Sequence, residues 1–327
     1  MKRNYTQDFI RALAIFLVVL LHVSAYFMGD NYKQLNAGFW VSTTFDAFAR
    51  ICVPLFVLSS GFFLIKEEGE SVATFFKKRT QKLLIPLIFW SLVYSEYSYG
   101  WHATAGDIAG GFISGRPYYH FWFLFMLVGL YFAAPFVNAL YRSYGFRKTN
   151  LLGFALLALG SITNLWDIYH VNSPFFLLWF IPYLGYFILG HTLPKMEYKI
   201  PAWASLLTYV AAAIALVAAA YLALITLNNS EYAFDYLSPL VIVASLSSYM
   251  FLVNMTLEES WITKIAQYSL GIYLIHVMFM EEFFQLTNKT IFGNAAADIL
   301  SLVLGIFIAS WASIYLISKI PLLKRTI

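Results

Sequence analysis

The stretch FIRALAIFLVVLLHVSAYF, residues 9–27, has the length and composition of a membrane-spanning helix, and it decides the fold class. A spanning helix needs roughly 20 predominantly apolar residues, because the hydrocarbon core of a bilayer is about 30 Å thick. Two ionisable side chains interrupt this run, Arg11 near its start and His22 well inside it. Ionisable residues inside a span are rare and indicate a functional site.

The rest of the chain has the same apolar character. Of its 327 residues, 61% are hydrophobic and 12% are charged, whereas a soluble domain has about 25% charged residues. Apolar runs recur along the whole chain, and the polar connections are too short to form a separate soluble domain. All spans should be helices, because lipid offers no hydrogen bonds to the backbone. We predict one all-α, integral-membrane domain over residues 1–327 with about ten spans, near residues 8–28, 40–64, 83–100, 119–140, 150–167, 174–193, 202–227, 237–256, 267–287 and 297–319.

The basic residues predict the orientation of these spans. With ten spans both termini lie on one side, and sixteen Lys and Arg residues fall on that side, in the loops, the termini or at the end of a span. Three fall in the opposite loops, namely Lys33, Arg116 and Lys289. Because Lys and Arg are enriched in cytoplasmic loops, we place both termini in the cytoplasm.

Arg11 and His22 are separated by eleven residues, about three helical turns, so they share one helix face with a rise of roughly 16 Å between them. Arg11 can extend towards the cytoplasm, as basic residues near helix ends commonly do. His22 lies too deep for that. It is either a core histidine bonded to a neighbouring helix or a functional group, and its depth in the span favours function.

Other spans bring polar side chains to a similar depth. Asp46 and Arg50 are four residues apart and therefore share a helix face, and the pair partly neutralises two charges that would each be costly alone. Together these polar residues predict a central polar cavity, and none shows metal-ligand spacing. The further cavity candidates are His120 and Trp122 in the fourth span and Ser269, Tyr273 and His276 in the ninth.

A basic segment, FFKKRTQKLLIP, lies between the second and third spans at the predicted cytoplasmic surface. Its residues Lys78, Arg79 and Lys82 have two interpretations. They set the topology and attract anionic lipids, or they bind the phosphates of a nucleotide-like cofactor through charge-assisted hydrogen bonds.

Five motifs in order resemble the membrane-bound acyltransferase-3 family. DFIRALA continuing to His22 is similar to its Arg-x10-His signature, RICVPLFVLSSGFFL to its second motif, and FFKKRTQKLLIP to its basic segment, where the family often has Arg at the position of Lys82. HFWFL and SLGIYLIH are similar to two later motifs. The resemblance covers nearly the whole chain.

This resemblance implies transfer of an acyl group, usually acetyl, from cytoplasmic acyl-CoA to a sugar hydroxyl of a bacterial surface polysaccharide or its lipid-linked precursor. It implies a bacterial inner-membrane location, His22 as the essential histidine, and Arg11 and Arg50 as the motif arginines. Arg11, Lys78, Arg79 and Lys82 would then bind acetyl-CoA. We expect membrane lipids as partners, no nucleic acid and no metal, and we leave a homo-oligomer open.

The chemistry of the residues agrees with this implication. A hydroxyl attacks a thioester slowly until a base removes its proton, and a buried neutral histidine is suited to that role. An acyl-histidine intermediate is the other route. Arg50, held by Asp46, would face the thioester carbonyl or a phosphate oxygen. Two other functions stay open: a transporter or flippase for a sugar or lipid-linked oligosaccharide, and a non-catalytic membrane scaffold.

Overall fold

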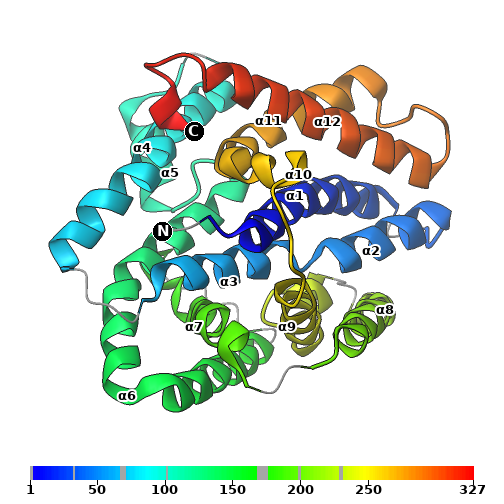
Figure 1. The fold of residues 1–327 in the computed structure, drawn as a ribbon. Helices are drawn as coiled ribbons and strands as arrows, with labels where there is room; N and C mark the ends of the chain where they lie inside the picture. The colour runs from blue at the N-terminus through cyan, green and yellow to red at the C-terminus, as the bar shows by residue number, and fades with distance from the viewer. Residues whose placement is uncertain are drawn as a thin grey trace. The chain divides into compact units, whose positions relative to one another are not determined.

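A computed structural model describes residues 3–31, 34–66, 71–100, 102–167, 176–197, 200–227 and 231–327 (Figure 1). Within these ranges every regular element is a helix, as the sequence predicts. Short 3₁₀ helices join or extend the α-helices. The α-helices are α1 (Tyr5–Asn31), α2 (Ala37–Ala49), α3 (Cys52–Leu64), α4 (Val72–Tyr99), α5 (Ala105–Ile113), α6 (Trp122–Asp167), α7 (Leu184–Thr192), α8 (Ala202–Leu227), α9 (Pro239–Val253), α10 (Trp261–Ile265), α11 (Ser269–Thr287) and α12 (Ala295–Ile317).

Six stretches of the described residues are long and apolar enough to cross a membrane. One of them, Tyr119–Leu165, covers two predicted runs, and the predicted runs at 83–100, 237–256 and 267–287 fall outside the six. The count of about ten spans, the cytoplasmic placement of the termini and the single domain over residues 1–327 stay predictions. The six stretches are Tyr5–Gly29, Ala37–Leu64, Tyr119–Leu165, Phe176–Lys195, Ala202–Thr226 and Ala295–Ile317.

Two helices differ in length from the predicted runs. Helix α6 covers the run at 150–167 and the run at 119–140 from Trp122 onward, but Gly145 has non-helical angles (φ 71°, ψ −177°) and divides it. A positive φ of this kind is accessible to glycine because it lacks a Cβ atom. Helix α4 begins at Val72, before the predicted run, where the Ser71 side chain accepts a hydrogen bond from the Thr74 amide. The basic segment is therefore helical.

The predicted run at 40–64 is divided into α2 and α3 by a break at Arg50 and Ile51. Pro54 explains the break, because proline has no N–H to bond the carbonyl four residues earlier, which here belongs to Arg50. The carbonyls at the end of α2 need other partners. The Tyr209 hydroxyl of α8 donates to the Phe48 carbonyl at 2.8 Å. Arg50 thus lies at a helix terminus inside the protein.

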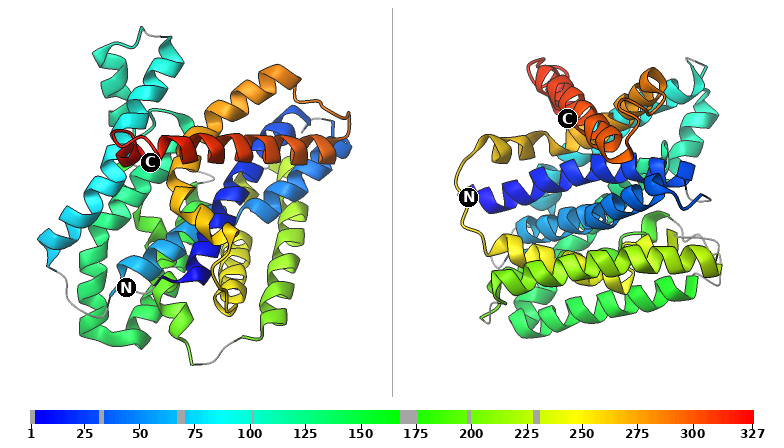
Figure 2. Two further views of the ribbon diagram at one scale, coloured as in Figure 1. Left: turned by 45° about the horizontal axis from the view of Figure 1, so that its top comes forward. Right: turned by 90° about the vertical axis from the view of Figure 1, so that its right-hand side faces the viewer.

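The chain divides into two compact units, each described by itself. The first consists of residues 1–56 and 196–317 and contains α1, α2, the first turn of α3, and α8 to α12. Helix α1 packs against α2, α9, α11 and α12, while α8 packs against α2 and α9. Figure 2 shows the axes of α1, α2, α8 and α9 roughly aligned, with α12 crossing α1. Helix α1 is therefore surrounded by neighbours.

The second unit consists of residues 57–195 and 318–327 and contains the rest of α3, α4 to α7 and the C-terminal 3₁₀ helix Lys324–Thr326. That short helix packs on α4, where the Trp90 indole donates to the Thr326 carbonyl at 2.8 Å. The Asn138 side chain of α6 bonds the end of α3, accepting from the Lys66 amide and donating to the Leu64 carbonyl. These contacts hold the end of α3 against α6 and the C-terminal 3₁₀ helix against α4.

Glycines allow α3 and α7 to approach closely within the second unit. A Cβ atom added to Gly61 would overlap the Phe187 carbonyl, and one added to Gly190 would overlap the Leu58 carbonyl. Small residues at helix contacts let backbones approach in membrane proteins, where lipid removes the hydrophobic drive for association.

We predict that Gly61→Ala and Gly190→Ala each lower the unfolding free energy by about 1–3 kcal/mol, because the backbones must separate. Thermal unfolding in detergent measures the change. Gly110→Ala is the control, since nothing lies within 4 Å of the added atom and its helix is exposed. Equal melting temperatures for all three variants would show that the α3–α7 contact is not tight.

Candidate active site

Two histidines from distant parts of the sequence are in hydrogen-bond contact in the first unit. His22 Nδ1 on α1 lies 3.0 Å from His276 Nε2 on α11. The ring centroids are 5.0 Å apart with an interplanar angle of 36°. The other ring nitrogen of His276, Nδ1, lies 2.7 Å from the carbonyl oxygen of Tyr273. The structure thus places one predicted cavity residue, His276, beside His22, and a second, Tyr273, beside His276.

The two rings differ in their access to a substrate. His276 is fully buried (0% exposed), and Tyr273 is 4% exposed. His22 is half-buried. Of the two histidines, His22 alone is therefore partly exposed.

Arg11 forms a second link between the same helices. One Nη2 N–H of Arg11 donates to Ser269 Oγ at 3.1 Å, and that hydroxyl donates to the Ala266 carbonyl at 2.9 Å. Helices α1 and α11 are thus joined at the level of Arg11 and again at the level of His22. Ser269 and His276, which the sequence places on one face of the ninth run, each bond a motif residue of α1.

Asp46 and Arg50 form the ion pair that their spacing predicts. The Arg50 Nε–H donates to Asp46 Oδ1 at 2.7 Å, and Arg50 Nη2 contacts the same oxygen. The Asp46 side chain is fully buried and that of Arg50 is 13% exposed. The positive charge also lies close enough to His22 for the two groups to interact electrostatically. Arg50 lies at the C-terminal end of α2, where the helix dipole favours a cation.

Two aromatic residues that the sequence did not predict complete the surroundings of Arg50. Its guanidinium carbon lies 4.8 Å from the Phe234 ring centroid and 5.5 Å from that of Tyr236. Both rings come from the connection between α8 and α9. Cation–π contacts of this kind hold an arginine in one orientation. No sequence signal in that connection identifies them, because the contact depends on how α8 and α9 pack beside α2.

His120 and Trp122, the remaining predicted cavity residues, lie in the second unit. His120 is 1% exposed, and the rings of Tyr94, Tyr118, Tyr119 and Phe121 surround it with centroids 4.7–5.8 Å away. The Trp122 ring lies 6.1 Å from that of Tyr183. The role of both residues in a cavity stays a prediction.

The predicted phosphate-binding residues occupy the first half of α4, also in the second unit. Lys82 is exposed, and the half-buried Arg79 places its guanidinium carbon 4.2 Å from the Phe75 ring centroid. Lys78 lies on the same helix, but its side chain is outside the described part of the structure. Their position on one helix is compatible with phosphate binding, which stays a prediction.

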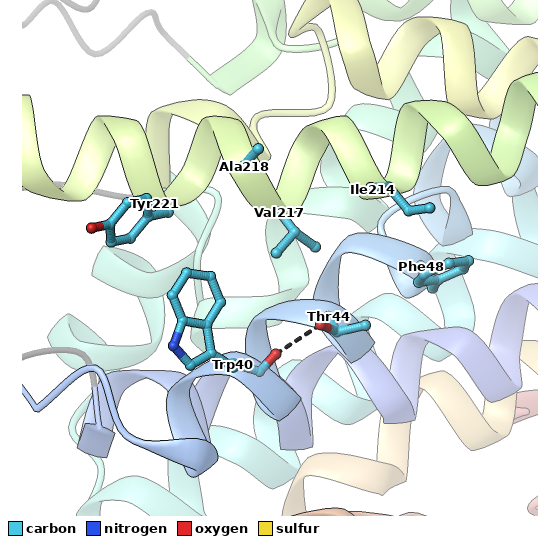
Figure 3. Close-up of a pocket in the computed structure, with 7 residues that line it drawn as sticks. All are labelled: Trp40, Thr44, Phe48, Ile214, Val217, Ala218 and Tyr221. Carbon is cyan, nitrogen blue, oxygen red and sulfur yellow. Dashed lines mark hydrogen bonds between the residues drawn. The ribbon is translucent and has the colours of Figure 1, made fainter.

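An apolar groove of about 370 Å³ lies between α2 and α8 (Figure 3). Its one hydroxyl on α2, that of Thr44, donates to the Trp40 carbonyl at 2.8 Å, and the Trp40 ring lies 5.2 Å from that of Tyr221. None of the predicted site residues lines the groove, so it is separate from the candidate active site. The lining residues are Trp40, Thr44, Phe48, Ile214, Val217, Ala218 and Tyr221.

Comparison with known proteins identifies the family. The acyltransferase-3 model, described as an acyltransferase domain, matches residues 4–317. The chain belongs to the acyltransferase-3 family. No curated protein and no solved structure matches it. The family and the apolar helices together make it a multi-pass membrane protein of an acyltransferase family. Among the described residues, no group of three or more His, Cys, Asp and Glu side chains is arranged to hold a metal ion.

We predict that Asp46→Leu and Arg50→Met each lower the unfolding free energy by about 3–5 kcal/mol, because each leaves one charge buried without its partner. The double variant should cost less than either single variant. A double-mutant cycle of unfolding free energies in detergent or lipid measures this coupling.

Glu259→Leu is the control for that cycle. It removes one partner of the exposed Glu259–Lys264 pair, whose side chains are 48% and 58% exposed, and should change stability by at most about 1 kcal/mol. Strictly additive effects at Asp46 and Arg50 would contradict a coupled buried pair.

Proposed function

We propose that this acyltransferase-3 protein transfers an acyl group, most simply acetyl, from cytoplasmic acyl-CoA to a hydroxyl of a surface polysaccharide or its lipid-linked precursor in the bacterial inner membrane. The observation that carries the proposal is the partly exposed His22, whose ring bonds the buried His276 and interacts electrostatically with Arg50. Membership in an acyltransferase family supports acyl transfer as the reaction.

In the direct route, His22 removes the proton of the acceptor hydroxyl as the oxygen attacks the thioester carbonyl carbon. The carbonyl oxygen gains negative charge in a tetrahedral intermediate. The C–S bond then breaks, the ester forms, and CoA leaves as a thiolate that takes the proton from His22. In the covalent route the His22 nitrogen attacks the thioester carbonyl carbon, the C–S bond breaks and CoA leaves as a thiolate. The acceptor hydroxyl then attacks the acyl-histidine, the N–C bond breaks as the ester forms, and the thiolate takes the hydroxyl proton.

Arg50 would stabilise the negative charge that develops on the carbonyl oxygen. Asp46 and the two rings hold the guanidinium in place before the substrates bind, and a preorganised donor of this kind contributes about 3–4 kcal/mol to transition-state stability. Charge alone is insufficient for this role, because the planar guanidinium has donors in fixed directions that lysine lacks.

The acyl donor would enter from the cytoplasmic side. Arg11 would contact its phosphate end, and the rise of roughly 16 Å from Arg11 to His22 is comparable to an extended pantetheine arm. The basic residues of α4, in the second unit, are the other residues predicted to bind phosphate. With its phosphates at Arg11 and its arm extended along α1, the acyl donor would place its thioester at the level of His22.

A transporter or flippase is the second candidate, and the break between α2 and α3 favours it, since interrupted helices commonly form transporter binding sites. The two functions differ in one product. An acyltransferase releases free CoA in proportion to the acceptor consumed, whereas a transporter moves the acceptor and leaves acetyl-CoA intact.

We predict that His22→Ala lowers acceptor-dependent CoA release by about 100-fold or more, the size of a general-base contribution. A thiol reagent measures the released CoA in detergent or proteoliposomes containing a lipid-linked oligosaccharide. His102→Ala is the matched control, because His102 is exposed and lies outside the site. Retention of more than about a tenth of the turnover would exclude His22 as base or acyl carrier.

We predict that replacing Lys78, Arg79 and Lys82 together by Gln raises the dissociation constant for acyl-CoA while the affinity for the acceptor is unchanged, since charge-assisted bonds to phosphates are lost. Calorimetry measures both affinities. The control replaces the exposed Arg142, Arg147 and Lys148 of α6 by Gln, with the same change in net charge. Equal loss of affinity in both triple variants would indicate a general surface effect.

A further inference from the structure

The contact between the two histidines determines which ring nitrogens carry protons. A carbonyl oxygen accepts hydrogen bonds and cannot donate them, so His276 Nδ1, at 2.7 Å from the Tyr273 carbonyl, must carry a hydrogen. His276 is fully buried among apolar helices, where an added charge would be costly, so we take its ring as neutral. A neutral imidazole has one N–H, so His276 Nε2 carries a lone pair.

The proton of His22 follows from that lone pair. Because His276 Nε2 is an acceptor, His22 Nδ1, at 3.0 Å, must donate to it and must carry the hydrogen. The lone pair of neutral His22 is therefore on Nε2.

We infer that His276 is a positioning residue, which holds His22 as the Nδ1–H tautomer and leaves Nε2 as the nitrogen that meets the substrate. The buried His276 ring does not touch the substrate itself. The catalytic part of this inference rests on the proposed function, whereas the tautomer does not.

The same hydrogen bond would assist the chemistry. When His22 Nε2 takes the proton of the acceptor hydroxyl, the imidazolium keeps its Nδ1–H bond to His276, and a charged donor makes that bond shorter and stronger. The backbone carbonyl of Tyr273 in turn keeps His276 oriented as an acceptor. If His22 instead carries the acyl group, the same arrangement makes Nε2 the nitrogen that forms the bond to the acyl carbon.

Two variants separate this role from simple packing. His276→Gln keeps an acceptor, because its amide oxygen can take the place of Nε2 and accept from His22. His276→Leu fills similar space without an acceptor. We expect His276→Leu to lower kcat at least about tenfold with little change in KM, because part of His22 adopts the wrong tautomer, and His276→Gln to recover most of kcat. Equal kcat values for two folded variants would overturn the positioning role.

The direct test is spectroscopic and needs no substrate. In protein labelled with ¹⁵N-histidine, the two ring nitrogens of a neutral histidine give distinct shifts for the N–H and the lone-pair nitrogen. Comparison with His22→Gln assigns the His22 signals. We expect wild type and His276→Gln to show His22 protonated at Nδ1, and His276→Leu to show a mixture of tautomers. His22 protonated at Nε2 in neutral wild-type protein would overturn the inference.

The outcomes distinguish the inference from the proposed function. A wild-type protein with the expected tautomer but without acceptor-dependent CoA release contradicts the proposed acyl transfer and leaves the tautomer assignment standing. An active wild-type protein with the opposite tautomer contradicts the assignment alone. If neither His276 variant folds, the wild-type spectrum still decides the tautomer.

Discussion

An ionisable side chain among apolar helices must receive its hydrogen bonds and its counter-charge from neighbouring helices, because neither lipid nor water is there to supply them. In the first unit this constraint explains which helices meet. Ser269 of α11 bonds Arg11 of α1, and His276 of the same helix bonds His22. Since lipid removes the hydrophobic drive for association, such polar contacts have a large part in fixing α11 against α1.

The break between α2 and α3 leaves backbone carbonyls that must also find hydrogen-bond partners inside the protein. Pro54 leaves the Arg50 carbonyl without its usual partner, and the Tyr209 hydroxyl donates to the Phe48 carbonyl in the last turn of α2. The break places the Arg50 side chain at a helix terminus beside Asp46. A continuous helix would have no such terminus at this point. The position of a cation near His22 therefore follows from one proline and one ion pair.

Much of the site could be predicted from local spacing. The helical period places Asp46 beside Arg50 and puts Ser269 and His276 on one face. Spacing gives no partner for His22, since His276 lies 254 residues away. Phe234 was not predicted because its contact with Arg50 depends on tertiary packing.

The sequence likewise predicted some features of the fold and missed others. The helical class follows from apolar composition, and the division of the long α6 agrees with two separate predicted runs. The predicted run at 40–64 corresponds to one candidate span, Ala37–Leu64, but the break at Arg50 inside it was not predicted, although Pro54 carried its signal. The early start of α4 was missed because its first turns are basic and were assigned to a loop.

The central claim is that the thioester meets the acceptor at His22 Nε2. A structure of the protein with a thioether analogue of acetyl-CoA, which cannot release its acyl group, tests this most directly. The account predicts the analogue's carbonyl carbon about 6 Å or less from His22 Nε2, the sum of one hydrogen bond and one attack distance through an intervening hydroxyl. An analogue bound with its carbonyl far from His22, on the other side of α1 or outside the first unit, would contradict it.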